Sequence, residues 1–466
     1  MPDMPEAPAS ANANATATAT ATASTTENAS TTESVYKTSR LRFGCFLAPH
    51  HPLGENPTLL FRRDLDLVEK LDGWGYDEFW CGEHHSTGWE MIASPEMFLA
   101  AAAERTKRIR LGTGVISLPY HHPFNVAQRL VQLDHMSMGR VIFGSGPGAL
   151  PSDAKMLRID PLRQRDMQDE SLGVIVRLLR GETVSYECDW FKLENAALQI
   201  LPFQDHIPMA AASTISPSGM KLAGKYSMGA LSIASNSTEG LAALPTQWTF
   251  AEQSALDHGG VADRDQWRVL MSWHLADDRD QARHEAVDGL QKWNNEYSVR
   301  VLGKSDAVHV EDKWALLEAA TAGTTVIGTP DEMCEAIQKV IDLTGGFGTV
   351  LGFAHDWANP EATSRSWELF ARRVMPEFNG SLVSMRRSAQ VVEAKKADLT
   401  AGAGRAIVAQ ISRDARAKEA FQVTLAQRQA LGAGSSAAAS AAASLAERGC
   451  AVAAATDADA PDGSHS

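Results

Sequence analysis

Short apolar runs alternate with longer amphipathic stretches through most of the chain. Runs rich in β-branched and aromatic residues predict strands, and apolar positions at helical spacing predict helices between them. Asn56-Pro57 and Ser94-Pro95 each predict a helix start, because a capping side chain precedes proline at the first helical position. The expected strands are residues 41–47, 76–83, 109–118, 140–146, 207–213, 229–235, 268–276 and 347–354. The expected helices include residues 57–74, 125–136, 330–343 and 360–374, with a long helix that ends near 180.

This alternation predicts an α/β fold with parallel strands and right-handed crossovers. About eight strands closing on themselves would form a (β/α)8 TIM barrel, and an open doubly wound sheet is the alternative. Residues 183–201 and 294–325 would be insertions into the barrel.

The two ends differ in composition from residues 41–380, which we expect to form the barrel domain. Residues 1–40 are small and polar, and residues 433–466 are rich in Ala and Ser, so we expect both to be disordered. Residues 381–432 carry spaced apolar and charged positions that predict a helical extension, either solvated or packed on a neighbouring subunit. We expect a homo-oligomer.

The charge balance excludes one class of function. The chain has 43 Lys+Arg and 57 Asp+Glu, a net charge of −14, which opposes nucleic-acid binding. No apolar run reaches the length of a membrane helix, and no secretory signal is apparent at the N-terminus. The cysteines lack disulfide or zinc spacing, so we expect a reduced, soluble, cytoplasmic protein. They are Cys45, Cys81, Cys188, Cys334 and Cys450.

Three consecutive polar residues, Glu83, His84 and His85, end the second expected strand. Barrel enzymes carry their catalytic groups at this end of the strands. A metal site is disfavoured because successive strand residues point to opposite faces, although a distorted strand end would relax that rule. A catalytic histidine, whose imidazole would titrate near the working pH, and a histidine that only completes hydrogen bonds are the remaining alternatives.

The fourth expected strand ends in a glycine-rich turn, residues 144–148. Glycine lets the backbone approach a planar or anionic ligand closely, which makes Ser145 and Gly146 candidate cofactor contacts. The turn is not a G-x-G-x-x-G motif, so a nicotinamide Rossmann site is disfavoured. A tight loop without a ligand is the alternative.

A second candidate ligand site precedes an expected helix at residues 220–226. Hydroxyl and backbone N–H groups at a helix N-terminus suit a phosphate ester, and Ser216, Ser218 and Gly219 lie there. Helix capping without a ligand is the alternative.

Large apolar side chains occur at or beyond several strand ends. Such residues at a barrel mouth would form an apolar pocket for a hydrocarbon-like substrate or an isoalloxazine ring, and ordinary core packing is the alternative. The candidates are Trp80, Trp89, Met91, Trp273, Phe353 and Trp357.

Residues 80–148 closely resemble the bacterial luciferase-like family of flavin-dependent monooxygenases. The specific elements are E-H-H at 83–85, L-G-T-x-x-x-x-L-P-x-x-H-P at 111–123 and L-D-x-M-S-x-G-R at 133–140. The resemblance extends over about residues 41–379, with V-I-G-T-P-D-E at 326–332 and R-V-M-P-E at 373–377. Within the family, the chain is most similar to limonene monooxygenases.

The resemblance implies a TIM barrel and a two-component reaction. A separate flavin reductase, using NAD(P)H, would supply reduced FMN or FAD, which reacts with O2 to form a C4a-(hydro)peroxyflavin in a dry pocket. The expected substrate is a small apolar molecule, with 1,2-epoxidation of a monoterpene alkene such as limonene as the preferred reaction. No metal is implied.

The resemblance also assigns roles to individual residues. His84 matches a histidine that supports the oxygenated flavin, and a non-proline cis peptide is expected at Gly114-Val115. Ser216, Ser218 and Gly219 match the phosphate-binding turn. Bacterial luciferase has a cysteine and a phosphate-contacting arginine where this chain has Gly146 and Pro147, so light emission is not implied and phosphate binding needs other donors.

Three alternative functions remain at this stage. An F420-dependent oxidoreductase would use the same barrel for hydride transfer. A Baeyer-Villiger or aldehyde monooxygenase would use the nucleophilic form of the peroxide. A non-catalytic flavin-binding subunit is the third alternative, which His84 and the intact phosphate turn disfavour.

Overall fold

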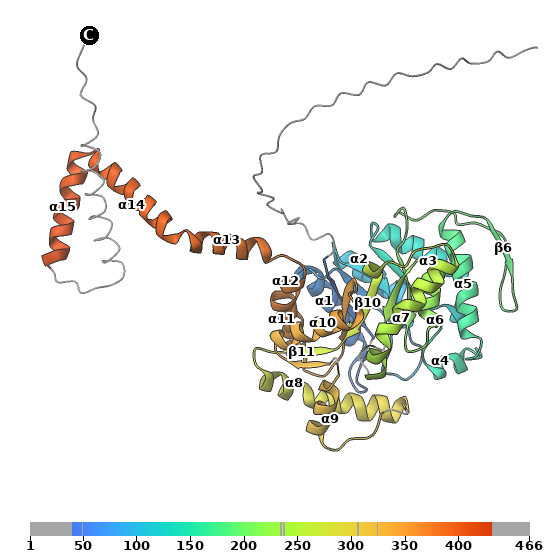
Figure 1. Cartoon of the computed structure of the whole chain (residues 1–466). Coiled ribbons are helices and arrows are strands. Elements are labelled where there is room, and N and C mark those ends of the chain that lie inside the picture. The colour runs from blue at the N-terminus through green and yellow to red at the C-terminus, as the bar shows by residue number, and fades with distance from the viewer. Residues whose placement is uncertain are drawn as a thin grey trace, which may run out of the picture. The chain divides into compact units, whose positions relative to one another are not determined.

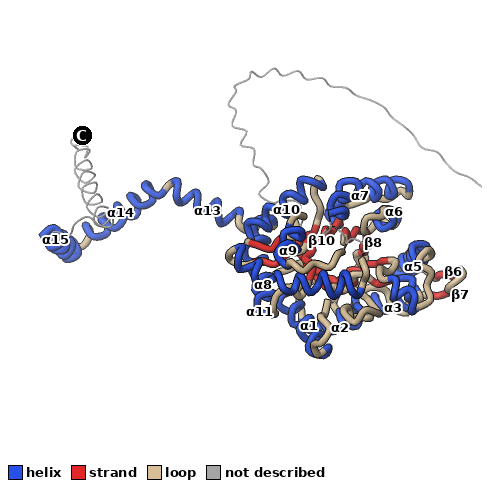
Figure 2. The backbone as a smooth tube through the Cα atoms, turned by 90° about the horizontal axis from the view of Figure 1, so that it is seen from below, coloured by secondary structure: helices blue, strands red, loops and turns tan. Residues whose placement is uncertain are grey.

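A computed structural model describes residues 40–48, 50–233, 235, 238–304, 307–323 and 325–430. Parallel strands form a closed barrel, and helices surround it (Figures 1 and 2). The sheet order is β3-β2-β1-β13-β10-β9-β8-β5-β4, and pairing of β3 with β5 closes it. Because β4 continues the position of β3, the barrel has eight strand positions, which confirms the TIM barrel and excludes the open sheet. The barrel strands are β1 (Arg42–Leu47), β2 (Glu78–Cys81), β3 (Arg110–Thr113), β4 (Ile116–Ser117), β5 (Val141–Gly146), β8 (Met209–Ser213), β9 (Gly229–Ser232), β10 (Trp267–Met271) and β13 (Thr349–Ala354).

Helices link the barrel strands, and the last of them follow β13. They are α1 (Pro57–Trp74), α2 (Pro95–Arg105), α3 (Pro123–Met136), α4 (Pro151–Met156), α5 (Gln164–Leu179), α6 (Ser218–Lys225), α7 (Thr238–Asp257), α8 (Arg279–Lys292), α9 (Lys313–Thr321), α10 (Pro330–Thr344), α11 (Pro360–Leu369) and α12 (Met375–Phe378). Shorter turns are 3-10 helices at Leu118–Tyr120 and Arg264–Gln266 and π-helices at Trp293–Val301 and Phe370–Val374.

Local sequence explains where the helices begin. The Asn56 side chain accepts a hydrogen bond from the Thr58 N–H at 2.9 Å, as the N-cap prediction requires. The helix start predicted at Ser94-Pro95 is also confirmed, because α2 begins at Pro95, but the Ser94 hydroxyl bonds the Glu96 carboxylate at 3.0 Å and makes no cap hydrogen bond. Helix α10 begins with a reciprocal capping box between Thr329 and Glu332.

Two expected strands are interrupted in the structure. Residues 109–118 divide into β3 and β4, and residues 268–276 divide into β10 and β11 (Trp273–Leu275). Strand β11 leaves the barrel and pairs in parallel with β12 (Val326–Gly328), where the sequence indicated only a helix start. Expected helix 360–374 likewise changes to a π-helix after Leu369.

The first expected insertion forms an antiparallel hairpin, β6 (Val184–Glu187) and β7 (Lys192–Ala196), which projects from the barrel in both ribbon views (Figures 1 and 2). The second insertion contains the π-helix at Trp293–Val301 and α9. Helices α7 and α8 complete the barrel and were not predicted from the sequence.

Helices also occupy the segment that follows the barrel. They are α13 (Val383–Ala394), α14 (Lys396–Ser412) and α15 (Ala415–Ala430), where a helical extension is predicted. Arg386 in α13 forms an ion pair with Glu377 in α12 at 2.6 Å. The two segments predicted to be disordered, 1–40 and 433–466, lie outside the described residues except for Arg40. The domain boundaries and the subunit number remain predictions.

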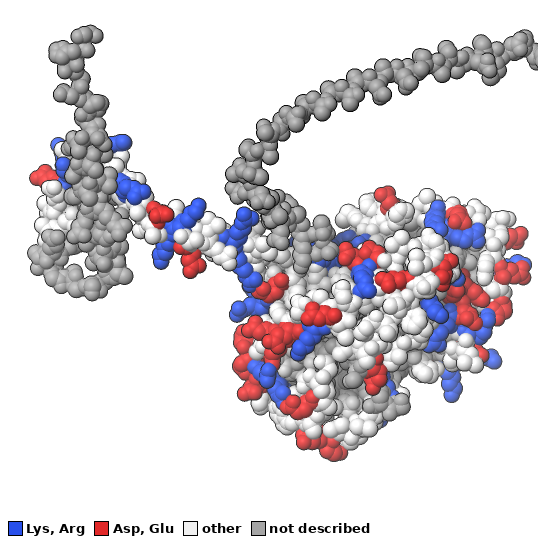
Figure 3. Space-filling view, in the orientation of Figure 1, with Lys and Arg blue, Asp and Glu red and all other residues white. Residues whose placement is uncertain are grey.

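Acidic and basic side chains are mixed over the face of the protein shown in Figure 3. Several form exposed pairs, such as Arg163 with Asp189 at 2.9 Å and Arg177 with Glu182 at 2.8 Å. Pairs of this kind contribute little to stability in water, so the dominant stabilising interactions lie in the interior.

Trp80 fills the centre of the barrel. It is fully buried among Phe46, Ile142 and other apolar residues that the strands direct inward. Its indole N–H donates to Glu78 at 2.9 Å, and Glu78 forms a buried ion pair with Arg268 at 2.7 Å. The barrel interior is therefore a packed core with one satisfied polar cluster.

The tight fit around Trp80 predicts a loss of stability for Gly112→Ala. A Cβ at residue 112 would lie 2.4 Å from the Trp80 ring, so the substitution overpacks the barrel centre. We expect the free energy of unfolding to fall by about 1–3 kcal/mol, measured by urea denaturation. Gly73→Ala is the matched control, because nothing lies within 4 Å of its Cβ position and alanine favours the helix. Equal stability of the two variants would contradict the packing argument.

Candidate functional site

A cavity of about 630 Å³ opens at the carboxyl ends of the barrel strands. Segments that follow β1, β2, β3, β5 and β8 contribute to its wall, and apolar side chains from the Trp293–Val301 π-helix cover part of it. Among the lining residues are His50, His84, Val115, Gly146, Ser216 and Phe353. The cavity thus brings together the strand-end histidine, the glycine-rich turn and the serine turn, which are distant in sequence.

His84 lies on the cavity wall between two carboxylates. Its Nε2 is 2.8 Å from the Glu90 carboxylate, and its Nδ1 is 3.1 Å from Oδ2 of Asp153. Burial alone would lower the pKa of His84, but the two carboxylates outweigh it and raise the pKa to about 10. The raised pKa disagrees with the expectation that His84 titrates near neutral pH and favours the imidazolium. Its Nδ1 hydrogen-bonds Asp153, whereas Nε2 only forms an ion pair with Glu90, whose Oε2 accepts no hydrogen bond from the described residues.

Glu90 connects His84 to a second histidine. Its other carboxylate oxygen lies 3.5 Å from Nε2 of His50, and a backbone bridge between residues 50 and 90 fixes this pairing. Burial alone would raise the pKa of Glu90, but His84 and His50 hold it far below its usual range. The His50 ring is surrounded by Tyr297 and Phe353, with ring centroids 4.9 and 5.1 Å away. The two histidines and Glu90 thus lie beside aromatic side chains of the cavity.

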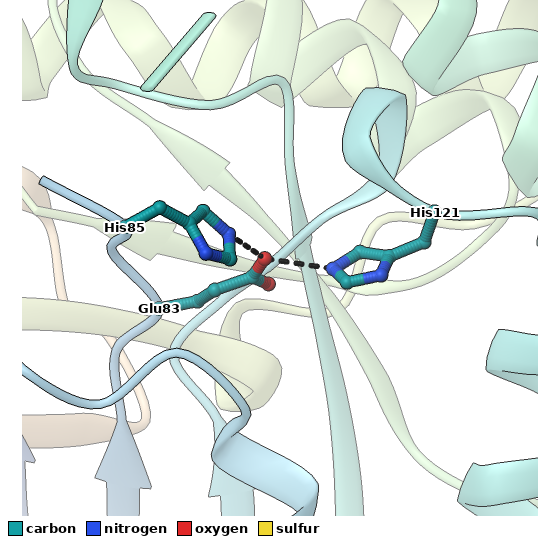
Figure 4. A group of neighbouring side chains, drawn as sticks. All are labelled: Glu83, His85 and His121. Carbon is teal, nitrogen blue, oxygen red and sulfur yellow. Dashed lines mark hydrogen bonds and ion pairs between the residues drawn. The ribbon is translucent and has the colours of Figure 1, made fainter. Parts of the chain in front are cut away.

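A separate cluster lies beside His84. Glu83 Oε1 accepts from Nε2 of His85 at 2.8 Å and from Nε2 of His121 at 2.7 Å, and both rings point at this carboxylate (Figure 4). The three groups are close enough to bind a metal ion. Arg129 lies 3.4 Å from Nδ1 of His121, so this nitrogen accepts and Nε2 carries the proton given to Glu83. A metal ligand needs Nε2 without its proton, and the pattern therefore favours a hydrogen-bonded cluster.

The cluster positions the turn after β3. The second Glu83 oxygen accepts from the backbone N–H of Ser117 at 2.9 Å. Two residues earlier, the peptide bond between Gly114 and Val115 is cis, which confirms that prediction. Gly114, Val115 and Gly146 line the cavity side by side, and a Cβ on Gly146 would lie 2.5 Å from the Val115 side chain. Glycine at 146 thus leaves room for the Val115 side chain.

The serine turn lies at the other end of the cavity, where α6 begins. Ser216 and Ser218 line the cavity, and their hydroxyls are 2.8 Å apart. Gly219 does not line it: a Cβ there would lie 2.0 Å from the Ala212 carbonyl, so glycine permits α6 to pack against β8. Ser145 also lies away from the cavity, fully buried, with its hydroxyl near Gln168 at 3.4 Å.

Arg165 is a cavity residue that the sequence did not reveal. It is the second residue of α5 and lines the cavity together with Ser218. Within the described residues, no carboxylate lies within ion-pair distance of its guanidinium. Its guanidinium can therefore contact a ligand in the cavity.

The structure separates the six predicted pocket residues. Phe353 lines the cavity. Trp89 does not line it and packs against Tyr297, with the two ring centroids 5.3 Å apart. Trp80 fills the barrel centre. Trp273 stacks on Phe370 at 4.1 Å, Trp357 stacks on His355 at 3.5 Å, and Met91 is half-buried outside the lining. The aromatic wall of the cavity instead includes Trp293 and Tyr297 from the Trp293–Val301 π-helix.

The sequence matches the luciferase-like monooxygenase family over residues 41–345, and the chain belongs to that family. It is 51% identical to 4-hydroxyprotoasukamycin monooxygenase of Streptomyces nodosus subsp. asukaensis, over 74% of this chain and 94% of that protein. It is 47% identical to limonene 1,2-monooxygenase of Rhodococcus erythropolis, over 74% of this chain and 88% of that protein.

A solved structure shares the barrel. It is the oxygenating constituent of 3,6-diketocamphane monooxygenase from Pseudomonas putida, a type II Baeyer-Villiger monooxygenase in complex with FMN. The TM-score is 0.62 at 25% identity, over 73% of this chain and 99% of that one.

Across the part of this chain that the structure describes, we find no helix with the length and apolar character of a membrane span.

Proposed function

We propose that this chain is a flavin-dependent monooxygenase that binds reduced flavin in the cavity above the barrel and oxygenates a small apolar substrate. The observation that carries this proposal is the meeting of three features in one cavity. These are the His84 imidazolium, the cis Gly114-Val115 turn and the Ser216–Ser218 turn with Arg165. Family membership and an FMN-bound solved structure of the same fold support it.

The residues present fit a flavin. The serine turn and Arg165 provide hydroxyl, backbone and cationic donors for a phosphate, and Gly114, Val115 and Gly146 provide a close apolar surface for a planar ring. The volume of about 630 Å³ lies within the usual range for ligand cavities. Bound reduced flavin would supply the electrons that activate O2.

The chain's own residues then have distinct tasks. His84 holds a proton at Nε2, where it can be donated to a developing negative charge in the cavity. Trp293, Tyr297 and Phe353 exclude water and present an apolar surface to the substrate. A permanently protonated His84 favours transfer of an electrophilic oxygen, which suits an alkene better than a ketone.

The preferred substrate class is therefore a small cyclic alkene, with 1,2-epoxidation of a limonene-like monoterpene as the specific reaction. The 47% identity to a limonene 1,2-monooxygenase supports this choice. A Baeyer-Villiger reaction is the second candidate, because the FMN-bound structure of similar fold is a Baeyer-Villiger enzyme. The reduced flavin would come from a separate reductase, and FMN and FAD both remain candidates.

One experiment tests the proposal directly. The purified protein, supplied with a reductase, NADH, FMN or FAD and O2, is given a panel of cyclic alkenes and cyclic ketones, and products are identified by mass spectrometry. We expect an epoxide containing one atom from labelled O2. Lactone formation would select the Baeyer-Villiger alternative. No oxygenated product with any flavin, or turnover with F420 without O2 consumption, would overturn the proposal.

Arg165→Ala provides a test of flavin placement. Loss of a charge-assisted hydrogen bond to phosphate is expected to weaken FMN binding about 10–100-fold, measured by fluorescence quenching. Riboflavin, which lacks the phosphate, should bind both proteins equally. Arg163→Ala is the matched control, because Arg163 lies two residues away, pairs with Asp189 and does not line the cavity. Equal weakening for FMN and riboflavin would contradict a phosphate contact.

A further inference from the structure

Asp153 lies behind His84, on the side away from the cavity. It belongs to the short helix α4, is 1% exposed and does not line the cavity. One carboxylate oxygen lies 3.1 Å from Nδ1 of His84. The other accepts from the backbone N–H of His85 at 3.2 Å and from the hydroxyl of Ser86. A single buried carboxylate thus contacts three consecutive residues after β2.

These contacts join two walls of the cavity. Asp153 follows the turn after β5, whose residues Gly146 to Leu150 line the cavity, whereas His84 to Ser86 follow β2. Burial alone would raise the pKa of Asp153, but its bonds to His84 and Ser86 lower it, so the side chain stays a carboxylate. An ionised carboxylate at one imidazole nitrogen fixes the proton there and sets the direction of the ring.

The charged groups facing His84 come from two segments. Glu90, in the loop after β2, approaches Nε2 on the cavity side, and Asp153 approaches Nδ1 from α4. His50 faces the far oxygen of Glu90, and His85 is turned toward Glu83. Asp153 is therefore the group that holds the Nδ1 end of the ring, while Glu90 shares the Nε2 end with any ligand in the cavity.

We propose that Asp153 is a positioning residue that acts through His84: it keeps the imidazole protonated and aims its Nε2–H at the cavity. This inference rests on the proposed function for its catalytic meaning, but its structural content can be tested without flavin. Asp153 touches no cavity ligand and is not a catalytic residue. Its effect reaches the reaction only through the charge and orientation of His84.

Histidine NMR on the full chain without flavin provides the first test. The protein is labelled with 13C at histidine Cε1, and His84→Gln identifies the His84 signal. In the native protein we expect this signal to remain in the protonated form from pH 6 to 9. In Asp153→Asn the titration midpoint should fall by about one pH unit or more, because a neutral amide replaces the carboxylate. Asp153→Glu should restore part of the shift.

A matched control separates this effect from disturbance of the loop. Ser152→Ala alters the adjacent residue and removes its hydroxyl contact with Ser86 at 2.7 Å, but leaves the carboxylate in place. The His84 signal should be unchanged in this variant. An unchanged His84 titration in a folded Asp153→Asn protein would overturn the proposal. An equal shift in Ser152→Ala would also overturn it, because the loop and not the carboxylate would then be responsible.

The second readout is the product formed per reduced flavin consumed, followed against pH. The native enzyme should keep a constant yield from pH 6 to 9, and Asp153→Asn should lose yield as the pH rises within that range. A flat profile in the variant, despite an altered His84 signal, would overturn the catalytic part of the proposal. If the native enzyme forms no product with any flavin, the proposed function fails, and the NMR result still decides the role of Asp153.

Discussion

Replacing His84 with alanine is expected to lower the yield of oxygenated product per reduced flavin by about 100-fold or more, with a matching rise in hydrogen peroxide. A positioned proton donor typically contributes a factor of this size, and alanine leaves Glu90 and Asp153 without the cation between them. Product and peroxide are measured in the same reaction after a known amount of reduced flavin is added.

The control is His135→Ala. His135 lies on α3 and bonds the Leu201 carbonyl at 2.9 Å, outside the cavity. Its loss should leave the yield near the native value. Flavin affinity should also be measured for His84→Ala, because weaker binding alone would lower the rate but not the yield at saturation. A native yield in His84→Ala would remove this side chain from the proposed reaction.

Arg268→Met is expected to lower the free energy of unfolding by about 3–5 kcal/mol. Arg268 binds Glu78 at 2.7 and 2.9 Å inside the barrel, where both side chains are 2% exposed. Burial alone would raise the pKa of Glu78, but Arg268 reverses the effect and lowers it. The variant keeps the buried carboxylate without its closest cation and leaves it only the Trp80 N–H at 2.9 Å and Arg42 at 3.9 Å, and an undercompensated buried charge is costly. Urea denaturation at pH 7 measures the loss.

Two further measurements test the cause. In Arg268→Met the folded-state pKa of Glu78 should rise above its unfolded value, so acidification protonates it and the deficit should shrink from pH 8 to pH 5. The double variant Glu78→Gln with Arg268→Met should recover part of the stability, because no buried charge remains. A deficit that is independent of pH and persists in the double variant would instead indicate loss of packing.

The barrel could be predicted from the sequence because its determinants are local. Apolar strand runs, helix spacing and starts such as Asn56-Pro57 all depend on neighbouring residues, and the structure has strands at each of the eight expected positions. The interruptions of strands 109–118 and 268–276 could not be predicted from periodicity, since the apolar pattern continues through them. The first was nevertheless anticipated in part, as the cis bond at Gly114-Val115, from the family resemblance.

The site was predictable only where a motif marked it. His84 was found from the strand-end E-H-H, but its protonation depends on Glu90 and Asp153, which approach from other loops. Asp153 lies 69 residues away and Arg165 lies in a different helix, so no spacing pointed to either. The aromatic residues were selected by strand position alone, and tertiary packing placed Trp80, Trp273 and Trp357 in the core.

The packing of Trp80 in the barrel centre limits the order in which ligands can bind in the cavity. Because Trp80 fills the barrel centre, the cavity does not continue through the barrel, and the proposed flavin and substrate would both enter it at the carboxyl ends of the strands. The ligand that lies deeper in the cavity would have to bind first and dissociate last. We therefore expect kinetics with compulsory ordering, in which a bulky substrate supplied early delays cofactor entry.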